Sequence, residues 1–109
     1  MIFDYDKMAY ETLEAFKGGE KQYHVHRYAD DNVTIMRGHL EPGASIGEHT
    51  HDDSCETIYI LSGTASVTID GKEERLIPGM AHYCPFGSTH TMRNPGPSPL
   101  DFFAVVAKK

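Results

Sequence analysis

The sequence predicts an all-β protein whose antiparallel strands close into a sandwich or barrel. From Gln22 onwards, short runs rich in β-branched and aromatic residues follow one another, and turn-forming residues separate them. Many short strands at close spacing in a chain of 109 residues are typical of a small sandwich or barrel. The chain has no internal repeat and no low-complexity tract, so we expect residues 1–109 to form a single domain.

The segment before these runs has a different pattern. Asp6 is a candidate N-cap, and Met8, Leu13 and Phe16 are sparse apolar positions that follow it. Gly18-Gly19 is a stop signal for a helix. This pattern predicts at most one short helix or helical turn, over Asp6–Phe16.

Eight strands are expected in the rest of the chain. Asp70-Gly71 lies between two alternating runs and predicts a two-residue hairpin, because glycine accepts the positive φ that such turns need. Gly63 and Pro78-Gly79 mark further turns, and Pro95–Pro99 is a stiff connection that cannot lie inside a central strand. The expected strands are Gln22–Tyr28, Val33–Leu40, Glu56–Leu61, Thr64–Asp70, Glu73–Ile77, His82–Cys84, His90–Arg93 and Leu100–Val106, the last with Phe102, Phe103, Val105 and Val106 as core residues.

Composition limits the partners that the protein can have. A net charge of −6 and a pI near 5.5 argue against nucleic acid and anionic membranes, which bind basic patches. No apolar run approaches the roughly 18 residues of a membrane span, and the N-terminus lacks the pattern of a signal peptide. We therefore expect a cytoplasmic protein in which Cys55 and Cys84 are free thiols; the alternative is a disulfide between them.

Three histidines and one glutamate form a candidate metal site. Their imidazole nitrogens and carboxylate oxygen suit several first-row transition metals. His49 and His51 point the same way on a strand, because side chains alternate between its faces. Glu56 has the wrong parity for that face and can rejoin it only if the chain turns within residues 52–55, which are turn formers. His90 must arrive from a neighbouring strand. We predict that these four residues bind one divalent transition metal ion.

The two stretches that contain these residues resemble the two sequence motifs of the cupin superfamily. In the first motif, residues 43–63, a glycine precedes a His-x-His pair, a glutamate and a second glycine. In the second, residues 79–94, a glycine precedes Pro-x-Gly, a histidine and an asparagine. The residues that fill these positions are Gly43, His49, His51, Glu56 and Gly63, and then Gly79, Pro85, Gly87, His90 and Asn94. Met80 departs from the family pattern, since many cupins carry an acidic residue there.

The resemblance implies a conical cupin-type barrel (a jelly roll, or double-stranded β-helix) with a metal ion near one mouth. Family members hold Mn, Fe, Ni, Cu, Zn or Co on the three histidines and the glutamate, and small ones commonly form homodimers through their outer sheets. They include dioxygenases, decarboxylases, isomerases, lyases, storage proteins and sugar-binding domains, so the fold alone decides little about the chemistry.

Three functions remain open. The intact ligand set favours a metal-dependent enzyme acting on a small polar, oxygen-rich or carboxylate-containing molecule. The alternatives are a small-molecule or metal-binding module without catalysis, such as a sensor, and a cupin with a structural metal. Ile58 and Ile60 share the strand face of Glu56, which predicts an apolar wall beside the ion.

Other histidines have less defined roles. His82 shares its strand face with Cys84 and is a catalytic candidate: it could relay a proton beside the metal, or it could only satisfy a hydrogen bond. His24 and His26 share a face, where a plain surface is favoured over a second metal site. His39 is expected at a strand edge.

Overall fold

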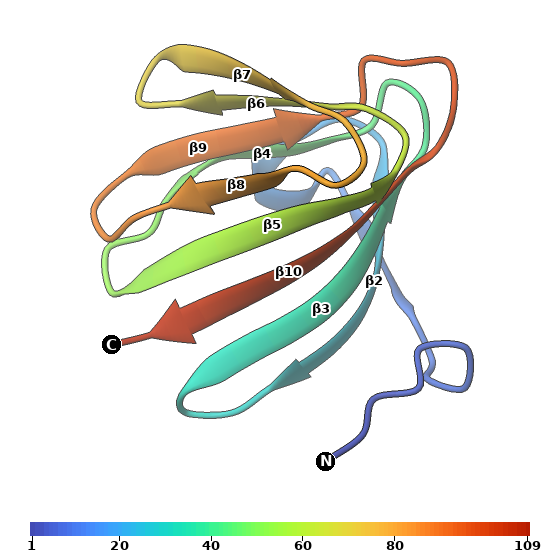
Figure 1. The fold of residues 1–109 in the computed structure, drawn as a ribbon, viewed down its shortest axis with the longest axis vertical. Helices are drawn as coiled ribbons and strands as arrows, with labels where there is room; N and C mark the ends of the chain where they lie inside the picture. Colours follow the sequence, from blue (N-terminus) through green and yellow to red (C-terminus); the bar gives the residue numbers. More distant parts are fainter.

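The computed structural model describes residues 1–109 as two antiparallel β-sheets packed face to face (Figure 1). The larger sheet has the strand order β1-β2-β3-β10-β5-β8, and the smaller has the order β4-β9-β6-β7. This arrangement confirms the all-β, cupin-type prediction. The strands are β1 (Glu11–Glu14), β2 (Gln22–Ala29), β3 (Val33–Leu40), β4 (Ser45–Thr50), β5 (Ser54–Ser62), β6 (Ala65–Ile69), β7 (Lys72–Leu76), β8 (Ala81–Cys84), β9 (Thr89–Arg93) and β10 (Leu100–Lys108).

All eight expected strands are present, with ends within two residues of the expected ones. The Asp70-Gly71 hairpin is confirmed: both residues have positive φ, 47° and 82°, and they join the paired residues Ile69 and Lys72. The stiff segment Pro95–Pro99 lies outside the strands and connects β9 to β10. β1 is an additional strand that was not predicted, and β4 is the strand expected to carry His49, for which no bounds were predicted.

The limit of one short helix in the N-terminal segment is met, but no helix spans Asp6–Phe16. The amides of Lys7 and Met8 bond to the carbonyl of Asp4, which makes one isolated turn. The chain then forms β1, which pairs with β2, and a three-residue 3-10 helix, η1 (Phe16–Gly18). The apolar positions are too sparse to form a helical stripe, so pairing with the free edge of β2 decides the structure. No helix in the structure is long and apolar enough to cross a membrane.

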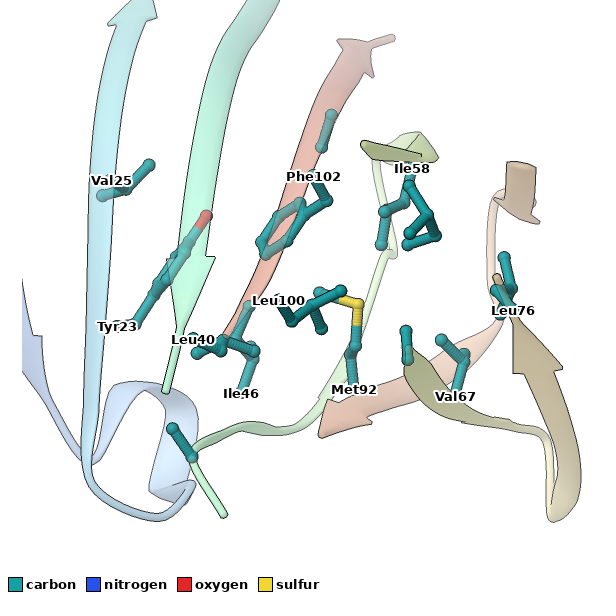
Figure 2. Packing of buried hydrophobic residues seen from close by; sticks show 14 residues of the cluster. Tyr23, Val25, Leu40, Ile46, Ile58, Val67, Leu76, Met92, Leu100 and Phe102 are labelled. Atoms are coloured by element: carbon teal, nitrogen blue, oxygen red, sulfur yellow. The ribbon is translucent and has the colours of Figure 1, made fainter. Parts of the chain in front are cut away.

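The core lies between the two sheets and contains 14 buried residues (Figure 2). β10 is central in the larger sheet, where it pairs with both β3 and β5. Its inward side chains include Leu100, Phe102 and Ala104, which are fully buried. Phe103 and Val105 are only half-buried and alternate with these residues, so their assignment to the core was wrong. Val106 is also half-buried and lines a cavity, so it is not a core residue either.

Candidate metal centre

Four potential metal ligands meet between the two sheets. His49 lies on β4, where it is the register partner of His90 on β9. The chain bends at Asp52-Asp53, immediately after His51, and then enters β5. That bend restores the parity of Glu56, as the sequence predicted, so Glu56 points inward together with the His51 side chain.

The ligand atoms of these four residues are close together, all within 4.8 Å of one another. The Nε2 atom of His90 lies 3.0 Å from Nε2 of His51 and 3.1 Å from Nε2 of His49. The Oε1 atom of Glu56 lies 3.2 Å from Nε2 of His51 and 3.1 Å from Nε2 of His90. Side chains contributed by three strands and one loop therefore converge on a single point.

These separations fit a shared metal ion. Two atoms bound to one ion at about 2.1 Å lie about 3.0 Å apart at a right angle and about 3.4 Å apart at the tetrahedral angle. The group is also protected from water: His51 and Glu56 are 8% exposed and His90 is 2% exposed. A bound cation would balance the charge of the carboxylate and satisfy the nitrogen lone pairs in such surroundings. The residues present therefore fit a divalent transition metal ion.

Each histidine of this group has a partner for its other ring nitrogen. Nδ1 of His49 lies 2.8 Å from the Gly47 carbonyl, which only accepts, so Nδ1 of His49 must donate and Nε2 is free to bind a metal. Nδ1 of His51 lies 2.8 Å from the Ser54 hydroxyl. Nδ1 of His90 lies 3.1 Å from Nε2 of His82. Such partners orient metal-binding imidazoles and fix their tautomers.

The electrostatics favour the protonation states that a metal requires. Burial would raise the pKa of Glu56, but hydrogen bonds with His51 and His90 and their charges lower it to about 2. Burial lowers the pKa of His49, which keeps its imidazole neutral at neutral pH. The group thus offers an anionic carboxylate and a neutral imidazole as ligands.

The four residues line a cavity of about 340 Å³. Its wall combines apolar and polar residues. Ile58 confirms the expectation of apolar residues on the Glu56 face, whereas Ile60 is buried in the core without lining the cavity. Two cationic side chains, Lys17 and Arg27, also line it. A small molecule in this cavity would contact both the metal site and an apolar surface. The other apolar lining residues include Val25, Met36, Ile46, Met92 and Phe102.

Tyr23 and Arg27 are among the polar residues of this cavity that were not predicted from the sequence. Tyr23 is 3% exposed, and burial raises the pKa of its hydroxyl. Arg27 forms a two-fold ion pair with Glu11 on β1, at 2.7 and 3.1 Å. The alternation of side chains along the strand could have identified both residues. Tyr23 and Arg27 alternate with the outward His24 and His26, so both point toward the barrel interior.

His82 is buried, at 2% exposure, but is not among the residues that line the cavity. Its Nε2 contacts His90, and its Nδ1 lies 2.8 Å from Oε1 of Glu74. Cys84 on the same strand is fully buried, and burial, together with the charge of Glu56, raises the pKa of its thiol to about 11. Cys84 and Cys55 are both free thiols.

The remaining histidines lie on the outward face of the larger sheet. His24 and His26 line a second cavity of about 320 Å³ together with Arg37. His39, at the same cavity, contacts the carboxylates of Asp101 at 2.9 Å and Glu41 at 3.0 Å. The nitrogens of His24 and His26 join no group of three potential metal ligands, which favours the surface interpretation over a second metal site.

The fold and the site have counterparts among known proteins. The family model "Cupin domain" matches residues 36–106. A mannose-1-phosphate guanylyltransferase from Escherichia coli (strain K12) is 32% identical over 108 residues, which cover 87% of this chain and 23% of that protein. An oxalate-binding protein from Thermotoga maritima is 34% identical over 72 residues, which cover 66% of this chain and 60% of that protein. The chain thus spans less than a quarter of that guanylyltransferase.

Solved structures show the same architecture. A predicted oxalate decarboxylase from Thermotoga maritima superimposes with a TM-score of 0.94 at 24% identity, over the whole of both chains. KdgF from Halomonas sp. superimposes with a TM-score of 0.81 at 18% identity, over 100% of this chain and 94% of that one. At such identities the likeness concerns the fold alone.

Proposed function

The chain belongs to the cupin family, and from that premise we propose that it is a metal-dependent enzyme acting on a small oxygen-rich or carboxylate-containing molecule. The proposed ligands of one divalent ion are His49, His51, Glu56 and His90. The observation that carries the proposal is that their four ligand atoms lie within 4.8 Å of one another on the wall of a cavity of about 340 Å³. An ion there would be reachable by a compact molecule.

Charge favours an anionic ligand at this site despite the acidic chain. Three neutral imidazoles and one carboxylate carry −1, so a divalent ion would leave about +1 at the cavity wall. Lys17 and Arg27 also line the cavity, where their charges are opposed by Asp53 on the wall and by Glu11, which pairs with Arg27. The apolar surroundings strengthen these attractions because they exclude water.

The protein's own groups would orient such a ligand. The ion, when bound, would supply Lewis-acid chemistry or activation of O₂. The Tyr23 hydroxyl donates to Sδ of Met36 at 3.5 Å, a weak acceptor that a ligand oxygen could replace. Arg27, held by Glu11, can bind a carboxylate. Apolar side chains such as Ile58 and Phe102 limit water, and the cavity volume excludes polymers.

The relatives support two ligand classes. Similarity to an oxalate-binding protein supports a small dicarboxylate. Similarity to a mannose-1-phosphate guanylyltransferase supports a sugar derivative, although the matched part is only 23% of that enzyme. Both classes offer oxygen atoms that can chelate a divalent ion.

A calorimetric titration of metal-loaded and metal-stripped protein tests this proposal. The panel comprises oxalate, 2-keto acids, sugar acids and sugar phosphates, and NMR of each incubated mixture detects turnover. We expect a compound to bind only the metal-loaded protein and to be converted. The proposal fails if nothing on the panel binds, or if removing the metal leaves binding unchanged.

A specific observation favours a second candidate, a binding module without catalysis. Apart from the four proposed ligands, Tyr23 is the only buried titratable residue on the cavity wall, whereas Lys17, Arg27 and Asp53 are exposed. The cavity thus lacks a buried acid–base pair independent of the metal ligands. Metal-dependent binding without turnover would support this candidate over the enzyme.

We also propose that the protein forms a homodimer through the outward face of its larger sheet. Tyr59 and Leu61 on β5 and Tyr83 on β8 expose 44%, 41% and 55% of their surface. Exposed aromatic and aliphatic side chains grouped on one face are typical of interfaces. Light scattering should give twice the monomer mass, and Tyr83→Arg should shift the protein toward the monomer. A monomeric wild-type protein would contradict this proposal.

A further inference from the structure

His90 is connected to the surface by a chain of two further side chains. Its Nδ1 atom lies 3.1 Å from Nε2 of His82, and Nδ1 of His82 lies 2.8 Å from Oε1 of Glu74. The two imidazole rings are stacked, with centroids 5.3 Å apart. Glu74 lies on β7, His82 on β8 and His90 on β9, so the contacts alternate between the two sheets.

The direction of each hydrogen bond follows from the two ends of this chain. An ionised Glu74 carboxylate can only accept, so Nδ1 of His82 must donate to it. A neutral His82 then has a lone pair on Nε2, which accepts from Nδ1 of His90. A neutral His90 with its proton on Nδ1 has a free lone pair on Nε2, the atom that faces His49, His51 and Glu56.

We propose that Glu74 and His82 are positioning residues that set the tautomer of His90 and hold its Nε2 ready for a metal ion. This inference rests on the proposed function, because it assumes that the site binds a metal. His82 is neither a proposed ligand nor a cavity residue. Its role is the one that Gly47 has for His49, where a carbonyl 2.8 Å away fixes the tautomer directly.

Burial explains why the chain of hydrogen bonds needs Glu74. The side chain of His82 is fully buried, whereas that of Glu74 is 44% exposed. A neutral imidazole has only two tautomers, so the two nitrogens of His82 compete for one proton. In the opposite tautomer, Nδ1 of His82 would face a carboxylate without a proton between them, and Nε2–H would point at His90. The carboxylate therefore selects one tautomer for both rings.

The first test reads the tautomer of His82 directly. Long-range ¹H–¹⁵N NMR of the imidazole rings, on protein with and without Zn²⁺, shows which nitrogen carries the proton. We expect His82 to carry it on Nδ1 in both states, and Glu74→Ala to reduce that preference. A proton on Nε2 of His82 in the wild-type protein would overturn the proposal without any variant being made.

The second test measures Zn²⁺ affinity by competition with a chromogenic chelator. Glu74→Gln should weaken binding about 10-fold and His82→Phe up to about 100-fold, the range seen for partners of metal ligands. Glu73→Gln is the matched control, because Glu73 is on the same strand but contacts Ser66 and Arg93 instead. If Glu74→Gln and His82→Phe bind Zn²⁺ as tightly as the wild-type protein and the Glu73→Gln control do, the proposal is overturned.

The outcomes separate this inference from the proposed function. If wild-type protein binds no Zn²⁺, cobalt or manganese, the proposed function fails and the positioning role fails with it, whatever the tautomer of His82. If wild-type protein binds Zn²⁺ and the variants bind it equally well, the inference fails alone. Thermal melting of each variant identifies any loss of affinity that reflects unfolding, and Glu74→Gln, at an exposed side chain, is the variant expected to fold.

Discussion

Gly38 on β3 leaves the space that the ring of Phe102 on β10 occupies. The two residues are register partners, and a Cβ atom on Gly38 would lie only 2.3 Å from Cζ of Phe102. The Phe102 ring stacks on that of Tyr23 at 5.9 Å, and both rings line the cavity beside the metal site. A glycine inside a strand thus determines where an aromatic wall of the cavity stands.

The first prediction is that Gly38→Ala forces the Phe102 ring to move. Overpacking of this kind costs about 1–3 kcal/mol of unfolding free energy, which chemical denaturation measures. Phe102→Leu in the same protein should recover part of that cost, because the two residues are coupled through contact. Strictly additive effects of the two substitutions would show that the ring has room to adapt.

The second prediction concerns the metal ligands. His51→Ala should lower affinity for a divalent metal by more than about 100-fold, since loss of a ligand exceeds the effect of losing a ligand's partner. Metal content after equilibrium dialysis measures this. His39→Ala is the control, because His39 contacts Asp101 and Glu41 on the opposite face of the larger sheet. Unchanged metal content in His51→Ala would rule out the proposed ligand set.

Most of the fold was predictable because its signals are local. Alternating apolar residues and the Asp70-Gly71 dipeptide determine strands and a hairpin without reference to the rest of the chain. β1 was not predictable in this way, because Glu11–Glu14 has no alternation of its own and becomes a strand by pairing with β2. The register of that pairing depends on the tertiary structure.

The grouping of the four metal ligands was predictable, but their environment was only partly so. Parity and the turn at residues 52–55 placed His49, His51 and Glu56 together. Tyr23 and Arg27 were within reach of the same parity argument, once the inward face of β2 is identified. The contact between Glu74 and His82 was not, since it joins strands of different sheets and depends on how the sheets pack.

The third prediction concerns the hairpin at Asp70-Gly71. Gly71→Ala should cost about 1–2 kcal/mol, because its φ of 82° is unfavourable for any residue with a Cβ. No atom lies within 4 Å of the added Cβ, so the cost isolates backbone strain. Gly96→Ala is the matched control: its Cβ would make an ordinary contact at 3.6 Å, without positive φ. Equal melting temperatures for the two variants would show that the positive φ of Gly71 does not cause the loss of stability.

The fourth prediction is that Asn94 stabilises the loop before β10 and does not bind the metal. Its buried side chain donates to the carbonyls of Leu40 and Ser98 and accepts from the amide of Gly96. Asn94→Ala should therefore cost about 1–3 kcal/mol, because partners remain buried without a bond. The exposed Asn32 offers a control whose replacement by Ala should be nearly neutral. Metal affinity of the folded Asn94 variant should equal that of the wild type.

The fifth prediction concerns the acid stability of the metal-free protein. The pKa of Glu56 is lowered from 4.5 to about 2 in the folded state by His51 and His90. A depressed folded-state pKa stabilises the protein above the unfolded pKa, and this stabilisation disappears as the pH falls from 4.5 towards 2.

Glu56→Gln should therefore flatten the dependence of unfolding free energy on pH in that window, by an amount on the order of 1–3 kcal/mol. Denaturant titrations in the presence of a chelator measure it, and Glu48→Gln, at an exposed position of β4, controls for the change in net charge. If wild-type and Glu56→Gln proteins lose stability in parallel as the pH falls, the Glu56 carboxylate is not held by the histidines in the metal-free state. The four side chains would then come together only when the metal ion is bound.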